Sequence, residues 1–278
     1  MVRKMLQSPP PVRTPAVAGM FYPGDSRELA QNMAQMLSAA AHEAPERAVP
    51  KAIIAPHAGY IYSGPVAASV YTLLVPARSR INRVVLLGPT HRVAVKGLAL
   101  PGCRAFATPL GTVEIDAAAI EALRGLPQVV VSPQAHALEH SLEVHLPFLQ
   151  TVFVNFKLVP LAVGHASVQE VADVIDALWG GPETLIIVSS DLSHYLSYGD
   201  AQAVDRATAT AILGLATDIS HEQACGATPV TGLNHIARRR RLKPELIDLR
   251  NSGDTAGDKS RVVGYGSFAF YEAAPDAR

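Results

Sequence analysis

The chain has 278 residues, of which 49% are hydrophobic and 17% are charged, so it has ample apolar material for a sheet covered on both faces. Lysine plus arginine and aspartate plus glutamate both number 24, which excludes a global electrostatic attraction to nucleic acid or to an anionic membrane. Two cysteines cannot form a disulfide framework. The first residues lack the apolar core of a signal peptide, and no segment approaches the roughly 18 continuous apolar residues of a membrane span. We therefore expect a cytoplasmic protein without nucleic-acid or membrane partners.

In chain order, we expect an irregular, proline-rich segment over residues 1–12, a single α/β domain over residues 13–272 and a tail over residues 273–278. Ser26 is placed to cap a first helix that carries Leu29 and Met33 on one face. Short aliphatic runs then alternate with segments of helical periodicity, which is typical of βαβ units. The expected strands are residues 52–55, 84–87, 129–131, 158–163, 185–188, 245–249 and 262–271. The expected helices are residues 66–74, 117–123, 141–153, 168–179, 201–215 and 229–240. This pattern predicts a mostly parallel sheet with helices on both faces.

Histidines follow three of the expected strands. His57 follows the run IIAP, His91 follows VVLLGPT, and His194 lies in the turn SSDLSH after LIIV. Parallel sheets bind ligands at the carboxyl ends of their strands, where side chains of neighbouring strands converge. Neutral imidazole binds Fe, Cu and Zn, so these histidines predict a shared metal-type site. Each one taken singly is equally compatible with a hydrogen-bonded structural histidine.

Further polar residues accompany these histidines. Asp191 either orients His194, binds the metal itself or caps its turn. The segment HALEHSLEVH holds several histidines and glutamates, but Glu143 and His145 are two residues apart and cannot share a helix face, which disfavours zinc-protease chemistry. His140, in the loop before the expected helix, is interpreted as an acid/base or substrate-binding residue, with structural hydrogen bonding as the rival. For His145 we expect a structural role.

Cys225 precedes a helix that Thr228 and Pro229 are expected to open. A thiol just before a helix N-terminus tends towards thiolate, which is a strong ligand for soft or borderline metals. The alternative is a small buried hydrophobic residue. Cys103 lacks such a setting and is expected to be structural.

Six segments, taken together, resemble the Memo family, whose bacterial members are often called AmmeMemoRadiSam system protein B. They follow the family order from about residue 13 to residue 272 and read RTPAVAGMFYP, PHAGYIYSG, GPTH, EHSLEVHLPFLQ, SSDLSHY and CGATP.

The resemblance implies a fold similar to the class III extradiol dioxygenases of the LigB type, which are non-haem iron enzymes. It implies His57, His91 and Cys225 as metal ligands for iron or copper, with Asp191 and His194 lining the same pocket and His194 standing at the acid/base position. A cysteine in place of a carboxylate departs from the facial triad of ring-cleaving Fe(II) enzymes. Catechol cleavage is therefore in doubt.

Three functions remain open at this point. The first is an oxidoreductase that uses Fe(II) or Cu, with His194, Asp191 and His140 as catalytic residues, although the ligand set suits Zn as well. Its partners would be a small molecule or peptide in the metal pocket and, by family association, AMMECR1-like and radical-SAM proteins. The second is a non-catalytic binding or regulatory module that keeps a dioxygenase-like pocket. The third is hydrolysis at a zinc site.

Overall fold

A computed structural model describes residues 11–41 and 48–273. The strands are β1 (Val12–Arg13), β2 (Ala52–Ala55), β3 (Arg83–Pro89), β4 (Leu98–Leu100), β5 (Ala105–Thr108), β6 (Gly111–Glu114), β7 (Val129–Val131), β8 (Lys157–Val163), β9 (Thr184–Ser189), β10 (His194–Leu196), β11 (Lys243–Asn251) and β12 (Val262–Tyr271). The α-helices are α1 (Ser26–Ala40), α2 (Tyr60–Tyr71), α3 (Ala117–Glu121), α4 (Pro133–Ala137), α5 (Leu146–Val152), α6 (Val168–Ala177), α7 (Tyr198–Leu213), α8 (Ala227–Arg240) and α9 (Ser252–Thr255). Short 3₁₀ segments span Thr72–Ala77 and Glu143–His145.

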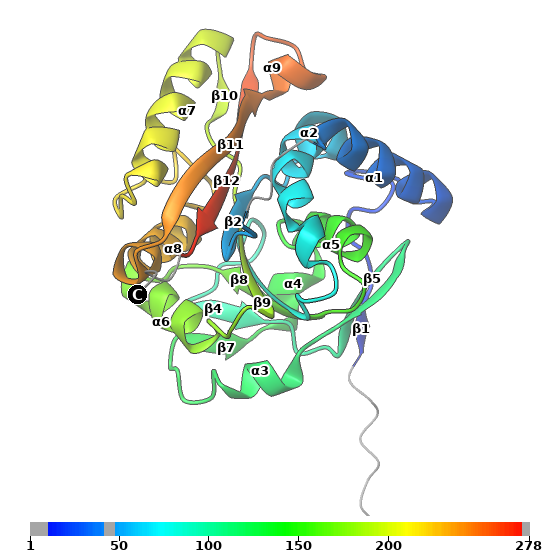
Figure 1. The fold of residues 1–278 in the computed structure, drawn as a ribbon, viewed down its shortest axis with the longest axis vertical. Helices are drawn as coiled ribbons and strands as arrows, with labels where there is room; N and C mark the ends of the chain where they lie inside the picture. The colour runs from blue at the N-terminus through cyan, green and yellow to red at the C-terminus, as the bar shows by residue number, and fades with distance from the viewer. Residues whose placement is uncertain (1–10, 42–47, 274–278) are drawn as a thin grey trace, which may run out of the picture.

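One large sheet forms the centre of the protein (Figure 1). Within the described residues its strand order is β10-β12-β2-β9-β3-β8-β4-β7, and β11 pairs with β12. The central strands β2, β9, β3 and β8 are parallel, as expected. At the flanks, β12 and β4 run antiparallel to β2 and β8, so the sheet as a whole is mixed. A smaller sheet has the order β1-β5-β6.

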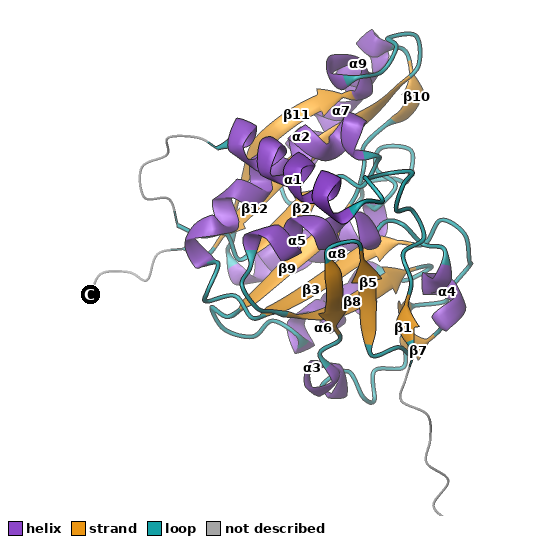
Figure 2. Ribbon diagram, turned by 90° about the vertical axis from the view of Figure 1, so that its right-hand side faces the viewer, coloured by secondary structure: helices purple, strands orange, loops and turns teal. Residues whose placement is uncertain are grey.

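Helices cover both faces of the large sheet, which confirms the predicted α/β fold. Figure 2 shows α1, α2 and α5 in front of the strands and α6 and α8 behind them. Successive residues of a strand point to opposite faces. In β3, accordingly, Val84 and Leu86 join the hydrophobic core under α1, α2 and α5, while Val85 and Leu87 join the core under α6 and α8.

The expected elements are present, but several boundaries differ. Asp25, and not Ser26, caps α1, because its side chain accepts the N–H groups of Arg27 and Glu28. The helix expected over residues 141–153 is shorter, because α5 begins only at Leu146. Pro147 lacks a backbone N–H, so it fits in the first turn of a helix but not in its interior. Helix α8 already begins at Ala227 with Gly226 as its N-cap, so Thr228 is not the cap.

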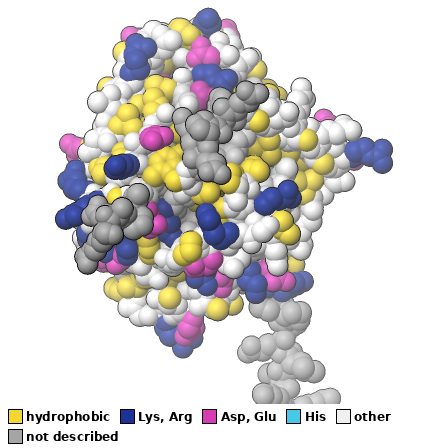
Figure 3. Space-filling view, viewed as in Figure 1, with side chains coloured by type: hydrophobic (Ala, Val, Ile, Leu, Met, Phe, Trp, Pro, Cys, Tyr) yellow, Lys and Arg dark blue, Asp and Glu magenta, His cyan; other side chains and the backbone are white. Residues whose placement is uncertain are grey.

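The chain ends lie largely outside the described residues. Of the segment over residues 1–12, Pro11 and Val12 are described, and Val12 pairs with Ala105 of β5. Of the tail over residues 273–278, only Ala273 is described. None of the described helices is long and apolar enough to cross a membrane. On the face seen in Figure 3, the described acidic and basic side chains are interspersed, in keeping with equal numbers of the two charges.

Candidate metal centre

The predicted strand ends meet at one edge of the large sheet. Strand β9 lies between β2 and β3, with Ala55 of β2 in register with Ser189 of β9. His57 follows β2 and His91 follows β3. Because the three strands are parallel and adjacent, the residues that leave their carboxyl ends converge, as the sequence predicted.

Three histidines form the centre of the site. The ligand atoms of His57, His91 and His140 all lie within 4.8 Å of one another. The rings of His91 and His140 stack with centroids 4.6 Å apart, and the His57 ring meets them edge-on at 5.2 and 5.5 Å. His57 is 2% exposed, whereas the His91 side chain is 30% exposed, so the cluster opens to solvent on the His91 side.

Glu139 fixes two members of this cluster. Its Oε1 accepts from Nδ1 of His91 at 2.9 Å and from the backbone N–H groups of His140 and Ser141, each at 2.9 Å. Burial raises the pKa of Glu139, but the hydrogen bonds from His91 and Ser141 and the nearby His91 ring outweigh it and bring the pKa to about 2. The carboxylate leaves Nε2 of His91 as the free ring nitrogen. Glu139 lies in the segment HALEHSLEVH, and its position directly before His140 is the only signal in the sequence for this role.

Asp191 lies beneath His57. Its Oδ1 accepts the backbone N–H of His57 at 2.7 Å, and the residue is buried. Burial raises the pKa of Asp191 to about 7, although the His57 hydrogen bond opposes that shift. Asp191 therefore fixes the loop that carries His57 and can carry a proton near neutral pH.

Cys225 lies beside His57 but is not part of the three-histidine group. Its Sγ is 3.4 Å from Nε2 of His57 and 3.3 Å from the backbone N of Asp191. Burial raises the pKa of the Cys225 thiol to about 12, and the nearby Asp191 carboxyl adds to this. The expectation of a lowered thiol pKa is therefore wrong for the metal-free protein, because desolvation outweighs the helix N-terminus.

His194 lies next to the cluster rather than within the three-histidine group. It begins β10, which pairs with β12, instead of lying in a free turn. Its Nδ1 is 2.8 Å from the backbone oxygen of Leu192, which can only accept, so Nδ1 carries the hydrogen. Burial lowers the pKa of His194, which favours the neutral ring and leaves Nε2 without a hydrogen.

A buried ion pair supports the segment that carries Glu139 and His140. Nη1 of Arg13 is 2.7 Å from Oε2 of Glu143, and Nη2 of Arg13 donates to the backbone oxygen of Glu139 at 2.6 Å. Glu143 also accepts from the Tyr22 hydroxyl and from the N–H groups of Ala16 and Val17. The N-terminal part of the domain is thereby fastened to the loop beneath the metal centre.

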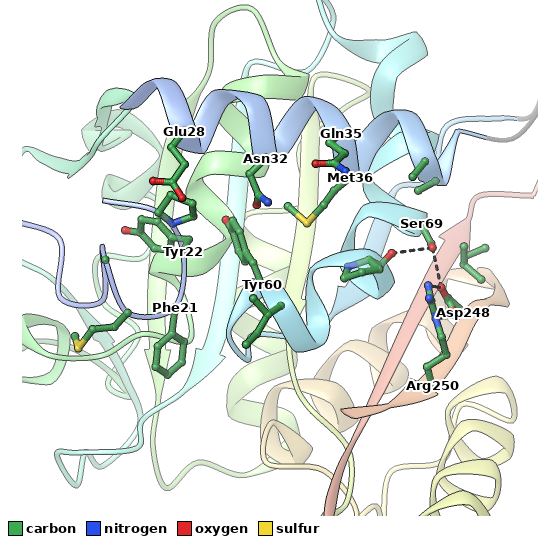
Figure 4. A pocket seen from close by; sticks show the side chains of 18 residues that line it. Phe21, Tyr22, Glu28, Asn32, Gln35, Met36, Tyr60, Ser69, Asp248 and Arg250 are labelled. Atoms are coloured by element: carbon green, nitrogen blue, oxygen red, sulfur yellow. Dashed lines mark hydrogen bonds and ion pairs between the residues drawn. The ribbon is translucent and has the colours of Figure 1, made fainter. Parts of the chain in front are cut away.

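A cavity of about 900 Å³ lies between α1, α2 and β11. Figure 4 shows Asn32 and Met36 of α1 facing Tyr60 of α2, with Asp248 and Arg250 of β11 at one end. Phe21 separates the cavity from the cluster, with its ring centroid 4.9 Å from that of His140. The cavity and the histidine cluster are therefore distinct features.

Comparison with known proteins places the chain in a family. The family model described as "Memo-like protein" matches residues 13–269. A "MEMO1 family protein" from Aquifex aeolicus is 38% identical over 267 residues, which cover 91% of this chain and 97% of that protein. Another, from Archaeoglobus fulgidus, is 33% identical over 276 residues, which cover 93% and 99%. The crystal structure of the uncharacterized protein JW3007 from Escherichia coli K12 is similar with a TM-score of 0.49 at 13% identity, over 77% of this chain and 98% of that one. The chain belongs to the Memo-like protein family.

Proposed function

We propose that this protein is an oxidoreductase that binds one transition-metal ion, with Fe(II) as the first choice and Cu or Zn as alternatives. One observation carries the proposal: the ligand atoms of three histidines on separate segments lie within 4.8 Å of one another. Neutral imidazoles are good ligands for all three metals. The small spread of these atoms is what a single ion requires.

The donor set fits such an ion. Nδ1 of His57 and Nδ1 of His91 are engaged by Ser189 and Glu139, so each ring offers Nε2. His140, predicted from the sequence as a catalytic residue, supplies the third imidazole in this proposal. Cys225, predicted as a ligand with His57 and His91, is the fourth donor, since its Sγ is 3.4 Å from Nε2 of His57.

A bound ion would supply redox and Lewis-acid chemistry at the open side of the cluster. The chain itself would handle protons there. His194 offers an unprotonated Nε2 as a proton acceptor, and the pKa of Asp191, raised to about 7 by burial, lets its carboxyl carry a proton near neutral pH. We assign His194 and Asp191 to proton transfer to and from a small molecule or peptide bound beside His91.

The cellular setting is part of the same proposal. We infer a cytoplasmic protein whose substrate comes from a system that includes radical-SAM and AMMECR1-like proteins, as the family resemblance implies. The relation to class III extradiol dioxygenases supports an oxygen-dependent reaction in the same way.

A non-catalytic binding or regulatory module is the alternative, and one observation favours it. Among the described residues, the group of ligand atoms contains no carboxylate, unlike the facial triad of ring-cleaving Fe(II) enzymes. The same pocket could then bind a metal and a ligand without turnover.

The test is metal analysis of protein purified without oxygen, followed by oxygen-uptake measurements with candidate catechols. About one metal ion per chain is expected for the wild type and for His235→Gln, a control in the second half of α8. His57→Gln and His91→Gln should lose the ion. Absence of metal from the wild type, or full metal content in both cluster variants, would refute the site. Tight metal binding without oxygen uptake would favour the non-catalytic module.

A further inference from the structure

A chain of buried hydrogen bonds lies behind His57. The Tyr71 hydroxyl is 2.9 Å from Nδ1 of His145, and Nε2 of His145 is 2.8 Å from Oγ of Ser189. The same Oγ is 2.6 Å from Nδ1 of His57 and 2.6 Å from the backbone oxygen of Ser141. Each of the four side chains is at most 2% exposed. Water therefore does not compete for these bonds, and their hydrogens can be assigned by counting donors and acceptors.

The backbone oxygen of Ser141 determines where the hydroxyl hydrogen of Ser189 points. A carbonyl oxygen can only accept, so the single hydrogen of the Ser189 hydroxyl points to Ser141. Oγ of Ser189 then has only lone pairs left for the two imidazoles. Nδ1 of His57 and Nε2 of His145 must therefore both carry a hydrogen.

The remaining ring nitrogens follow from this. A neutral imidazole carries one N–H, and burial in this apolar setting disfavours a charged ring. Nδ1 of His145 is then an acceptor, which matches the Tyr71 hydroxyl that faces it. Nε2 of His57 is bare, and this atom lies 3.4 Å from Sγ of Cys225, on the side of the metal centre. One arrangement of hydrogens thus satisfies all the hydrogen bonds that link Tyr71, His145, Ser189 and His57, and it leaves Nε2 of His57 as the free ring nitrogen.

We propose that Ser189 is a positioning residue, which, held by Ser141, His145 and Tyr71, keeps His57 in its Nδ1–H tautomer and presents Nε2 to the metal centre. The link to a metal rests on the proposed function, whereas the tautomer is a property of the metal-free chain. His57 thus differs from His91, because its partner is a neutral hydroxyl and that of His91 is a carboxylate. A carboxylate partner makes an imidazole the more basic ligand, so the two histidines would not be equivalent.

The supports of Ser189 come from different layers of the fold. Ser189 ends β9 at the centre of the sheet, and Tyr71 ends α2, where its ring stacks on Phe148 of α5 at a centroid distance of 4.7 Å. His145 belongs to the 3₁₀ segment that Glu143 ties to Arg13. These anchors leave the His57 ring little freedom to flip.

The test is ¹⁵N NMR of the metal-free protein labelled at histidine, which distinguishes Nδ1–H from Nε2–H rings. His57→Gln and His145→Gln identify the two residues by the signals that disappear. The wild type should show the Nδ1–H form at His57 and the Nε2–H form at His145. An Nε2–H form at His57 in the wild type would overturn the proposal.

Ser189→Ala removes the acceptor that both rings need. The His57 signal should then show a mixture of tautomers, and the affinity for Zn²⁺, measured by competition with a fluorescent chelator, should fall about 10- to 100-fold. Tyr60→Phe is the control, because it also removes one buried hydroxyl, but that hydroxyl donates to the backbone oxygen of Val144 instead of contacting His57 or His145. An unchanged His57 tautomer in Ser189→Ala would refute the positioning role.

If Ser189→Ala fails to fold, His145→Gln is a second variant, which keeps the hydrogen bond to Ser189. The amide of glutamine can donate to Ser189 as Nε2 of His145 does, so the Nδ1–H form of His57 should persist. Loss of that form in this variant would contradict the assignment. If the wild type bound no Zn²⁺ but showed the expected tautomers, the proposed function would fail and the hydrogen-bond assignment would stand.

Discussion

Nδ1 of His91 lies 2.9 Å from Oε1 of Glu139, and this carboxylate also holds the backbone of His140. A single buried side chain thus sets the ring orientation of one proposed ligand and the backbone of another. Its 1% side-chain exposure shields these bonds from water. A substitution of Glu139 should therefore disturb the histidine cluster without removing any of the proposed metal ligands.

Glu139→Gln should weaken metal binding without removing a ligand. The amide is neutral and one of its ends donates, so the clamp on His91 and His140 loosens. We expect a 10- to 100-fold lower affinity for Zn²⁺ in a chelator competition. Glu170→Gln, in a surface capping box, is the control and should leave the affinity unchanged. An affinity equal to that of the wild type in Glu139→Gln would contradict the clamp.

Cys225→Ser tests whether the cysteine contacts the ion. In Co²⁺-loaded protein, a thiolate ligand gives a sulfur-to-cobalt charge-transfer absorption that nitrogen and oxygen ligands lack. This absorption should be present in the wild type and in Cys103→Ser, and it should disappear in Cys225→Ser. Its absence from the wild type would show that the histidines bind Co²⁺ without the cysteine.

Arg13→Met should destabilise the fold. The substitution leaves the Glu143 carboxylate buried, with 0% side-chain exposure and without its cation. Removing one partner of a buried pair costs about 3–5 kcal/mol of unfolding free energy. Urea denaturation measures this loss, and the double variant Arg13→Met/Glu143→Gln should recover part of it. A loss below about 1 kcal/mol, the scale of an exposed ion pair, would show that the pair is not effectively buried.

His136 should make stability depend on pH. Burial lowers its pKa to about 4, and its Nε2 donates to the backbone oxygen of Ala99 at 2.7 Å. The unfolded chain, with a pKa near 6.5, binds more protons between these two values. The His136 contribution is therefore fully present above about pH 6.5 and is lost as the pH falls towards 4.

The variant His136→Gln keeps a donor for Ala99 but does not titrate. Relative to this variant, the wild type should therefore lose roughly 3 kcal/mol of unfolding free energy between pH 7 and pH 4, because each unit of pKa difference corresponds to about 1.36 kcal/mol. Urea denaturation at a series of pH values measures it. A difference that stays constant with pH would show that His136 is not desolvated in the folded state.

The strands that carry the site were predictable from local pattern. The aliphatic runs of β2, β3 and β9 are fully buried in the sheet, and such continuous runs are the signature of central parallel strands. The short strands β4 and β10 were not expected, because three residues are too few to show a period. The equally short β7 was predicted, since its three residues are all valines. The helix predicted over residues 141–153 begins later in the structure, because Pro147 cannot donate a backbone hydrogen bond inside a helix. Hydrophobic periodicity, from which the helix was predicted, contains no information on backbone hydrogen bonds.

The α/β class, the family and the convergence of His57 and His91 could all be predicted without the structure, because residues that follow parallel strands come to the same edge of a sheet. That His140 joins them as the third imidazole, while Cys225 and His194 lie outside this group, depended on contacts between segments far apart in the chain. His140 enters the cluster through a loop that Glu139 and Arg13 hold in place, and the contact of Arg13 with the backbone oxygen of Glu139 joins residues 126 positions apart. The state of Cys225 was likewise decided by burial, which outweighs the helix terminus that the sequence reveals. Desolvation depends on everything that surrounds a group in space, and local sequence does not contain that information.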